Sequence, residues 1–206
     1  MPDCLVRAIV TFAFSLAPML AVSAQSVAAG PPVLPADVRF MQEMLGHHQQ
    51  AVEMTALLRK RTRTREMLLL AERIETSQTD EMALMRRWLL RQGATVQGAT
   101  VQGADSMSGH VMHGDAMHGD SMQHALMPGM LTASQMRALA RATGARFDRL
   151  FLDGMIQHHR GAITMVAALR ASPGAAQESA LNRFIIDVDA DQRAEIARMR
   201  RMRARL

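Results

Sequence analysis

The chain has 206 residues, 49% of them hydrophobic and 21% charged, enough for one domain or two small repeated units around a buried core. The formal net charge is +5, but the chain contains one Trp, no Tyr and six Phe, and its arginines are spread along predicted helices, so nucleic acid is not an expected partner. The single cysteine, Cys4, excludes a disulfide framework within the chain.

Residues 1–24 are predicted to form a secretory signal peptide. Arg7 precedes an apolar run over 8–20, and small residues follow up to Ala24, after which cleavage is expected. Charges interrupt every later apolar stretch, so we expect no membrane insertion once the signal has been cleaved. This prediction places the mature protein in the periplasm or outside the cell.

Residues 36–92 are predicted to form a first helical hairpin. Apolar residues recur at spacings of three and four from Phe40 to Leu58, and Gly and Pro are scarce, as in an amphipathic helix. A second helix is expected from about Thr64 to Arg91.

Residues 93–130 are predicted to be a flexible, low-complexity linker. A five-residue unit begins at Gly93 and Gly98, and the later units carry methionine at every fifth position. Such a Gly-rich segment cannot supply a core and is expected to be mobile without a ligand. Because a flexible chain can wrap a soft ion without strict geometry, we expect weaker metal sites here, formed by His110, Met112, His113, Met117, His118, Met122 and His124.

Residues 131–206 are predicted to form a second helical hairpin that shares one domain with the first. Thr132 and Gln135 resemble a capping box that opens a short helix, Gly144 interrupts it, and a long helix follows to about Ala171. After a Ser-Pro-Gly breaker, a last helix continues toward the C-terminus. Two such hairpins predict an all-α fold, a four-helix bundle.

The second hairpin repeats the first. At an offset of 111 residues, seven positions are identical within an 18-residue window, and these positions include a pair of adjacent histidines preceded by methionine. A further series of matches, at an offset of 114, relates Gln78 and Glu81 to Gln192 and Glu195. The two halves therefore carry the same polar side chains at corresponding places.

The duplicated motif is the main candidate for a metal site. Residues three and four apart share a helix face, so Met44 lies beside His47 and His48, and the same relationship recurs in the second half. Di-iron helix bundles place Glu three residues before His, and exchanging this carboxylate for a thioether favours Cu(I) or a similar soft ion. Zinc, bound through the imidazoles alone, is an alternative. The predicted main ligands are Met44, His47, His48, Met54, Met155, His158, His159 and Met165, with Met82, Met85 and Met199 as further candidates.

Non-metal interpretations account for several other residues. Methionine at helical spacing is commonly core filler, which is the interpretation we prefer for Met67. The matched carboxylates Asp37 and Asp148 fit helix starts as well as acid–base chemistry, and no phosphate loop or nucleophile–base pair is present, so we do not expect an enzyme. Glu81 and Glu195 are interpreted as a polar helix face or as groups that bond within a hairpin.

The segment from Phe147 to Met165, together with Gln192, Glu195 and Met199, resembles the domain of unknown function 305 family, some of whose members are CopM-like periplasmic copper-binding proteins. The resemblance covers most of the chain outside the signal and the linker. It implies a ferritin-like bundle whose Met and His side chains bind Cu(I), Cu(II) or Ag(I), with a role in metal tolerance. The eight main ligands named above are the positions that the resemblance implies.

Three functions follow from these observations. The first is metal sequestration or handover, with a copper efflux or chaperone protein as a possible recipient. The second is a ferritin-like metal oxidase, which would consume oxygen with Cu(I) or Fe(II). The third is a metal-free helical interaction module, whose stability would not respond to copper.

The two halves of the repeat differ at one position that bears on helix packing. Gln50 stands where the second half has Gly161, which predicts a less close approach of helices in the first half.

Overall fold

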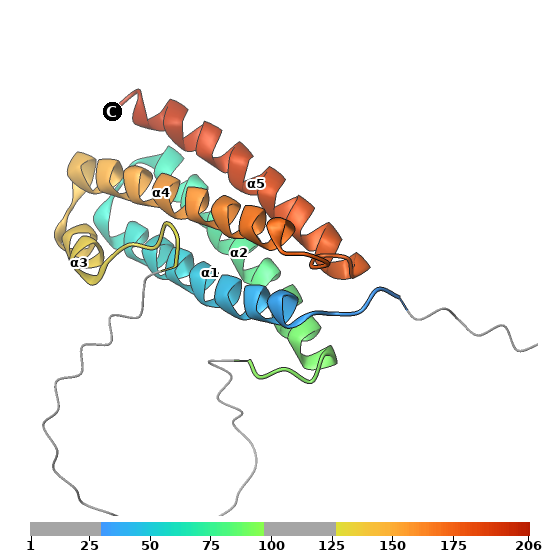
Figure 1. The fold of residues 1–206 in the computed structure, drawn as a ribbon. Helices are drawn as coiled ribbons and strands as arrows, with labels where there is room; N and C mark the ends of the chain where they lie inside the picture. Colours follow the sequence, from blue (N-terminus) through green and yellow to red (C-terminus); the bar gives the residue numbers. More distant parts are fainter. Residues whose placement is uncertain (1–29, 97–126) are drawn as a thin grey trace, which may run out of the picture.

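Four long helices, arranged as two antiparallel pairs, make up most of the structure (Figure 1). The computed structural model describes residues 30–96 and 127–206. No strand occurs within these ranges. The predicted all-α bundle of two helical hairpins is therefore confirmed. Its elements are α1 (Pro35–Arg61), α2 (Arg65–Arg91), the short α3 (Ala133–Arg141), α4 (Gly144–Ala171) and α5 (Ser179–Arg203).

The helix boundaries follow signals in the sequence. The Thr132 hydroxyl accepts a hydrogen bond from the Gln135 backbone amide, and the Gln135 side chain accepts one from the Thr132 amide, so the predicted capping box opens α3. Ala142 and Thr143 separate α3 from α4, and Gly144, the first residue of α4, has a φ of +57°, which favours glycine. The breaker after Ala171 ends α4 as predicted.

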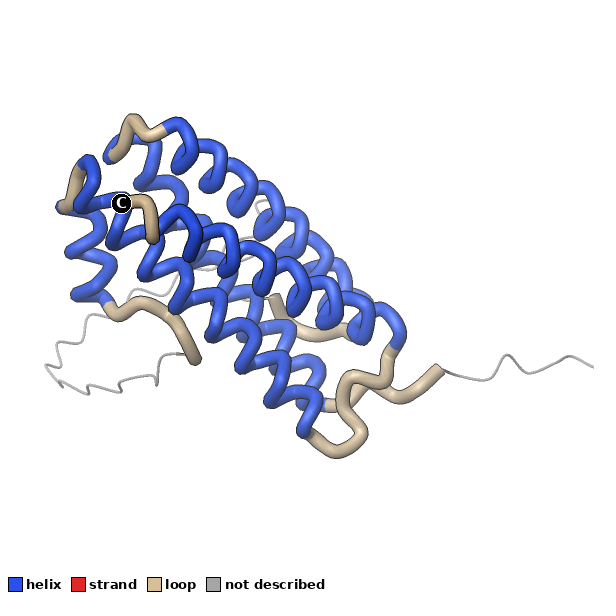
Figure 2. Tube along the Cα trace, turned by 90° about the horizontal axis from the view of Figure 1, so that it is seen from above, coloured by secondary structure: helices blue, strands red, loops and turns tan. Residues whose placement is uncertain are grey.

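α1 and α4 form the centre of the bundle. α1 contacts both α2 and α4, while α4 contacts α1, α5 and the short α3. Figure 2 shows from above that the long helices run side by side, with their connections at the ends. Among the described residues, no helix has the length and apolarity needed to cross a membrane.

The interior consists of two apolar clusters with a polar layer between them. Each long helix contributes apolar residues to both clusters and buried polar residues between the two stretches. The first cluster includes Phe40, Leu45, Trp88, Leu89, Val166, Leu169, Leu181 and Ile185. The second cluster includes Leu58, Leu70, Ile74, Leu131, Phe147, Phe151, Ile156 and Ile196. The polar layer comprises His47, His48, Gln78, Glu81, His158, His159, Gln192 and Glu195.

Two buried carboxylates connect the hairpins at opposite ends of the bundle. Asp37, near the start of α1, accepts a 2.8 Å hydrogen bond from the amide of Ala176 in the α4–α5 turn. Asp148, its counterpart in α4, accepts a 2.8 Å hydrogen bond from the hydroxyl of Thr64 in the α1–α2 turn. Each matched carboxylate therefore lies near a helix start, as expected, and binds the turn of the other hairpin.

The ends of the predicted linker belong to the bundle. Gln42 on α1 donates a 2.9 Å hydrogen bond to the carbonyl of Thr95, and Val96 and Met127 pack against the first cluster. Apolar burial and this hydrogen bond attach both ends to the bundle. The seven predicted linker ligands and the predicted signal peptide lie outside the described residues.

Candidate metal site

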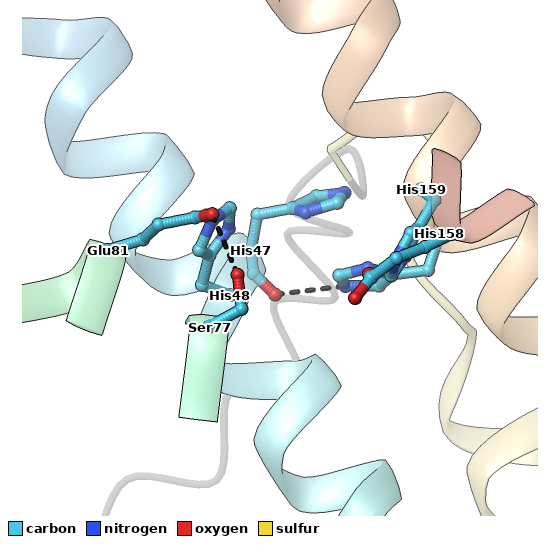
Figure 3. A network of polar contacts seen from close by, with 7 residues as sticks. His47, His48, Ser77, Glu81, His158 and His159 are labelled. Atoms are coloured by element: carbon cyan, nitrogen blue, oxygen red, sulfur yellow. Dashed lines mark hydrogen bonds and ion pairs between the residues drawn. The ribbon is translucent and has the colours of Figure 1, made fainter. Parts of the chain in front are cut away.

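Four histidines form the centre of the polar layer (Figure 3). His47 and His48 on α1 and His158 and His159 on α4 are all buried. The rings of His47 and His158 contact each other across the α1–α4 interface, with centroids 3.8 Å apart. The two His-His pairs, separated by 111 residues in the sequence, thus form one group.

Two carboxylates hold the outer histidines. Nε2 of His48 lies 2.5 Å from Oε2 of Glu81, and Nε2 of His159 lies 2.5 Å from Oε2 of Glu195. The Ser77 hydroxyl donates to the other oxygen of Glu81, at 3.1 Å. Both carboxylates are buried, so they do not form an exposed polar helix face. Each binds a histidine on the other helix of its own hairpin, which is the other interpretation given for them, hydrogen bonding within a hairpin. Their shared register in the repeat was the signal that could have related them to the paired histidines.

Two backbone carbonyls hold the inner histidines. Nε2 of His158 donates a 2.9 Å hydrogen bond to the carbonyl of His47. Nε2 of His47 donates a 3.0 Å hydrogen bond to the carbonyl of Pro128. Pro128 was not predicted to take part in the site, because it lay within the presumed flexible linker.

The opposite nitrogen of every ring is free. Within the described part of the chain, Nδ1 of each of the four histidines is buried and has no hydrogen-bond partner. Since Nε2 holds the proton in a bond to an oxygen, Nδ1 of the neutral ring keeps its lone pair. Histidines that bind metals usually donate their other N–H to a carboxylate or a carbonyl in the same way. The four rings therefore fit the role of metal ligands through Nδ1.

The inner histidines are neutral at physiological pH. Burial, followed by the neighbouring His48 ring, lowers the pKa of His47 from 6.5 to about 3. Burial, followed by His47, lowers the pKa of His158 well below 6.5. Because metal binding requires the unprotonated imidazole, both rings are in the binding form at neutral pH.

The candidate methionines of each hairpin are divided between the two apolar clusters. Met44 and Met54 of α1 are both buried but lie in different clusters, on either side of the polar layer. The methyl group of Met54 lies 3.3 Å from the position that a Cβ on Gly154 of α4 would occupy, next to Met155. Each cluster thus combines methionines of both hairpins: Met44, Met82, Met85 and Met165 in the first, and Met54, Met155 and Met199 in the second.

Sulfur adjoins the histidines in sequence on both central helices. Met44 precedes His47 by one helical turn, and Met155 has the same relationship to His158. Over residues 30–96 and 127–206, His and carboxylate side chains alone form no group of three or more suited to a metal ion. Thioethers and imidazoles are therefore the donors to consider together. All eight predicted main ligands are buried, the histidines in the polar layer and the methionines in the two apolar clusters beside it.

Comparison with known proteins gives the same fold. No curated protein shows significant similarity to the chain. A DUF305 fragment from Deinococcus radiodurans has 30% identity and a TM-score of 0.65, with 85% of this chain and 100% of that chain covered. A DUF305 protein from Streptomyces coelicolor, described as secreted, has 26% identity and a TM-score of 0.62, with 80% and 89% covered.

CopM has also been solved with bound metal. Its Cu(II)-bound form has 25% identity to this chain and a TM-score of 0.60, with 82% of this chain and 96% of that chain covered. Its Cu(I)- and Ag-bound forms, at 23% and 24% identity, show the shared fold alone. The family model described as "Domain of unknown function (DUF305)" matches residues 37–203. As the sequence predicted, the chain belongs to the DUF305 family.

Proposed function

We propose that this protein binds soft metal ions inside its helical bundle, with copper preferred and silver as an alternative, and sequesters them or passes them on outside the cytoplasm. The observation that carries the proposal is the hydrogen bonding of the four histidines. Each Nε2 is held by a carbonyl or a carboxylate, while each Nδ1 is buried and free among the described residues.

The methionines give the preference for soft ions. A thioether binds Cu(I) without deprotonation, and it takes the place of the thiolates that oxidising compartments damage. On one side of the polar layer, Met44 and Met165 share the first cluster and supply sulfur from both hairpins. On the other side, Met54 and Met155 supply it to the second cluster.

The relatives support this assignment. CopM, which shares the fold, has been solved with Cu(II) bound. A second relative is described as secreted, in keeping with the signal peptide expected over residues 1–24. Histidines and methionines of the linker would add weaker sites to those in the bundle.

Competition for Cu(I) tests the proposal. We would titrate the full chain anaerobically against a chromophoric chelator, beside a chain lacking residues 97–126, because residues 94–96 and 127–131 contact the bundle. Tight binding that survives the deletion is expected. Failure of both chains to compete would refute copper binding and favour a metal-free helical module.

A second measurement separates binding from oxidation. The proposal includes no catalytic turnover, so mixing the protein with Cu(I) or Fe(II) in air should consume oxygen no faster than the metal alone. Accelerated consumption that disappears in the His158→Gln variant would instead identify a metal oxidase.

A further inference from the structure

Residues Met127–Leu131 form a short strap across the polar layer. Met127 packs against the first cluster and Leu131 belongs to the second, so the residues between them pass over the histidines. Gln50 fixes one end: its side-chain oxygen accepts a 2.7 Å hydrogen bond from the Leu131 amide, and its side-chain nitrogen donates a 3.0 Å bond to the Leu131 carbonyl. The strap is therefore held in a defined position on the bundle.

The strap meets α4 at two glycines. A Cβ on Gly161 would lie 1.8 Å from the Pro128 carbonyl oxygen, a distance that no side chain tolerates. Gly129 has a φ of +79°, and a Cβ there would lie 2.5 Å from the carbonyl oxygen of Gln157. The backbone of Pro128 can approach α4 this closely only because position 161 has no side chain. Gly161 thus serves contact with the strap, whereas the sequence had predicted closer helix packing.

The strap also breaks the symmetry of the histidines. In the repeat, His47 corresponds to His158, and His158 donates its Nε2 proton to the carbonyl of His47. Exact symmetry would have His47 donate to the carbonyl of His158. It donates instead to Pro128, which therefore provides an acceptor that the duplicated helices do not.

We propose that Gly161 and Pro128 are positioning residues for His47: the Pro128 carbonyl, admitted by the missing side chain at Gly161, keeps the proton on Nε2 and leaves Nδ1 to bind the metal. The assignment of His47 as a ligand rests on the proposed function. The positioning itself is a property of the metal-free protein. Without the carbonyl, neither nitrogen of the buried ring would have an acceptor, so the hydrogen bond that favours the proton on Nε2 over Nδ1 would be lost and both tautomers would be populated.

The test compares two glycine-to-alanine substitutions in the full chain. Gly161→Ala pushes the strap away from α4. Gly46→Ala is the matched control, because a Cβ at position 46 of α1 would make an ordinary 3.6 Å contact with the methyl group of Met127. Gln50→Ala is a second route to the same end, since it releases the strap at Leu131 without adding an atom near the histidines.

The first readout is the tautomer of His47 in the metal-free protein, measured from imidazole ¹⁵N chemical shifts and assigned with His47→Gln. The unchanged chain and Gly46→Ala should show a proton on Nε2. Gly161→Ala and, to a smaller degree, Gln50→Ala should show a second tautomer at His47, while His158 keeps its own, because its acceptor is on α1. A purely structural role for Gly161 would not redistribute this proton.

The second readout is Cu(I) affinity, which should fall roughly 10–100-fold in Gly161→Ala and remain unchanged in Gly46→Ala. An unchanged His47 tautomer in both Gly161→Ala and Gln50→Ala would overturn the proposal, and so would a shifted tautomer with unchanged affinity. If the tautomer shifts but the unchanged chain binds no Cu(I), the carbonyl still positions His47, and it is the proposed metal function that fails.

Discussion

The imidazole rings of His47 and His158 lie against each other with their centroids 3.8 Å apart and their planes tilted by 36°. A proton on one ring would place a positive charge against the other ring inside the bundle. Burial and this proximity both lower the pKa of the two rings, so the pair stays neutral in the folded protein at physiological pH.

We expect acid to destabilise the fold through this pair. The unfolded chain protonates these histidines near pH 6.5, whereas the folded pKa of His47 is about 3 and that of His158 is also lowered. The stability that the neutral pair contributes is therefore fully present above pH 6.5 and is lost as the pH falls below it, by up to about 1.4 kcal/mol per pH unit for each ring. Urea unfolding at pH 7, 6 and 5 measures how the free energy of unfolding changes with pH. The double variant His47→Gln/His158→Gln should show a shallower slope, and equal slopes would contradict the expectation.

Removing the charge of Glu81 or Glu195 should weaken metal binding. Glu81→Gln keeps an oxygen near Nε2 of His48 but removes the negative charge that orients the ring and raises its basicity. We expect Cu(I) affinity to fall roughly tenfold, at the lower end of such effects. Glu72→Gln, an exposed position on the same helix, is the control. Equal affinities of the two variants would show that the carboxylate does not support the site.

Methionine pairs across the hairpins should be coupled in copper binding. Met→Leu substitutions nearly conserve volume and should each cost less than about 1.5 kcal/mol of stability. In a double-mutant cycle read by Cu(I) affinity, we expect Met44 and Met165, which share the first cluster, to be non-additive. Met44 and Met54, in different clusters, should be additive. Met67→Leu, a buried change assigned to core packing, should leave affinity unchanged.

The contact between Asp37 and the α4–α5 turn should contribute to the free energy of unfolding and not to Cu(I) affinity. The two carboxylate oxygens of Asp37 accept hydrogen bonds from the backbone amides of Leu34 and Ala176. Asp37→Asn replaces one of these acceptors with an NH₂ group, which is a donor. Loss of a buried acceptor should lower the free energy of unfolding by about 1–3 kcal/mol, measured by urea denaturation. Asp80→Asn, exposed on α2, should have little effect. A large fall in Cu(I) affinity in Asp37→Asn would instead relate this carboxylate to the metal site.

Local signals in the sequence predicted the helices well. The capping box at Thr132 and Gln135 and the interruption at Gly144 depend only on neighbouring residues, so they could be located without tertiary information. The duplicated His-His pairs were also found, because the repeat gave two copies of the same pattern. Their meeting in one layer follows from the packing of α1 against α4.

The partners of the histidines could not be predicted in the same way. Which side chain reaches Nε2 of His48 depends on how far α1 and α2 are shifted relative to each other along their axes. The hydrophobic periodicity of the sequence does not determine this shift. The strap was missed for a similar reason: Pro128 lies in low-complexity sequence, and its position is decided by Gly161, which is 33 residues away in the chain. The cluster that each methionine joins likewise depends on the antiparallel arrangement of α1 and α4.

Asp37 and Asp148 each bind the turn of the other hairpin, so the bundle resembles a homodimer whose two subunits have been joined into one chain. Each hairpin supplies one carboxylate and one receiving turn, so two separate peptides, 30–96 and 127–206, would contain every group that these two contacts use. Five-residue units can therefore be gained or lost between the halves while both contacts are kept. A change in the number of methionines and histidines between the halves would thus leave both carboxylate contacts in place.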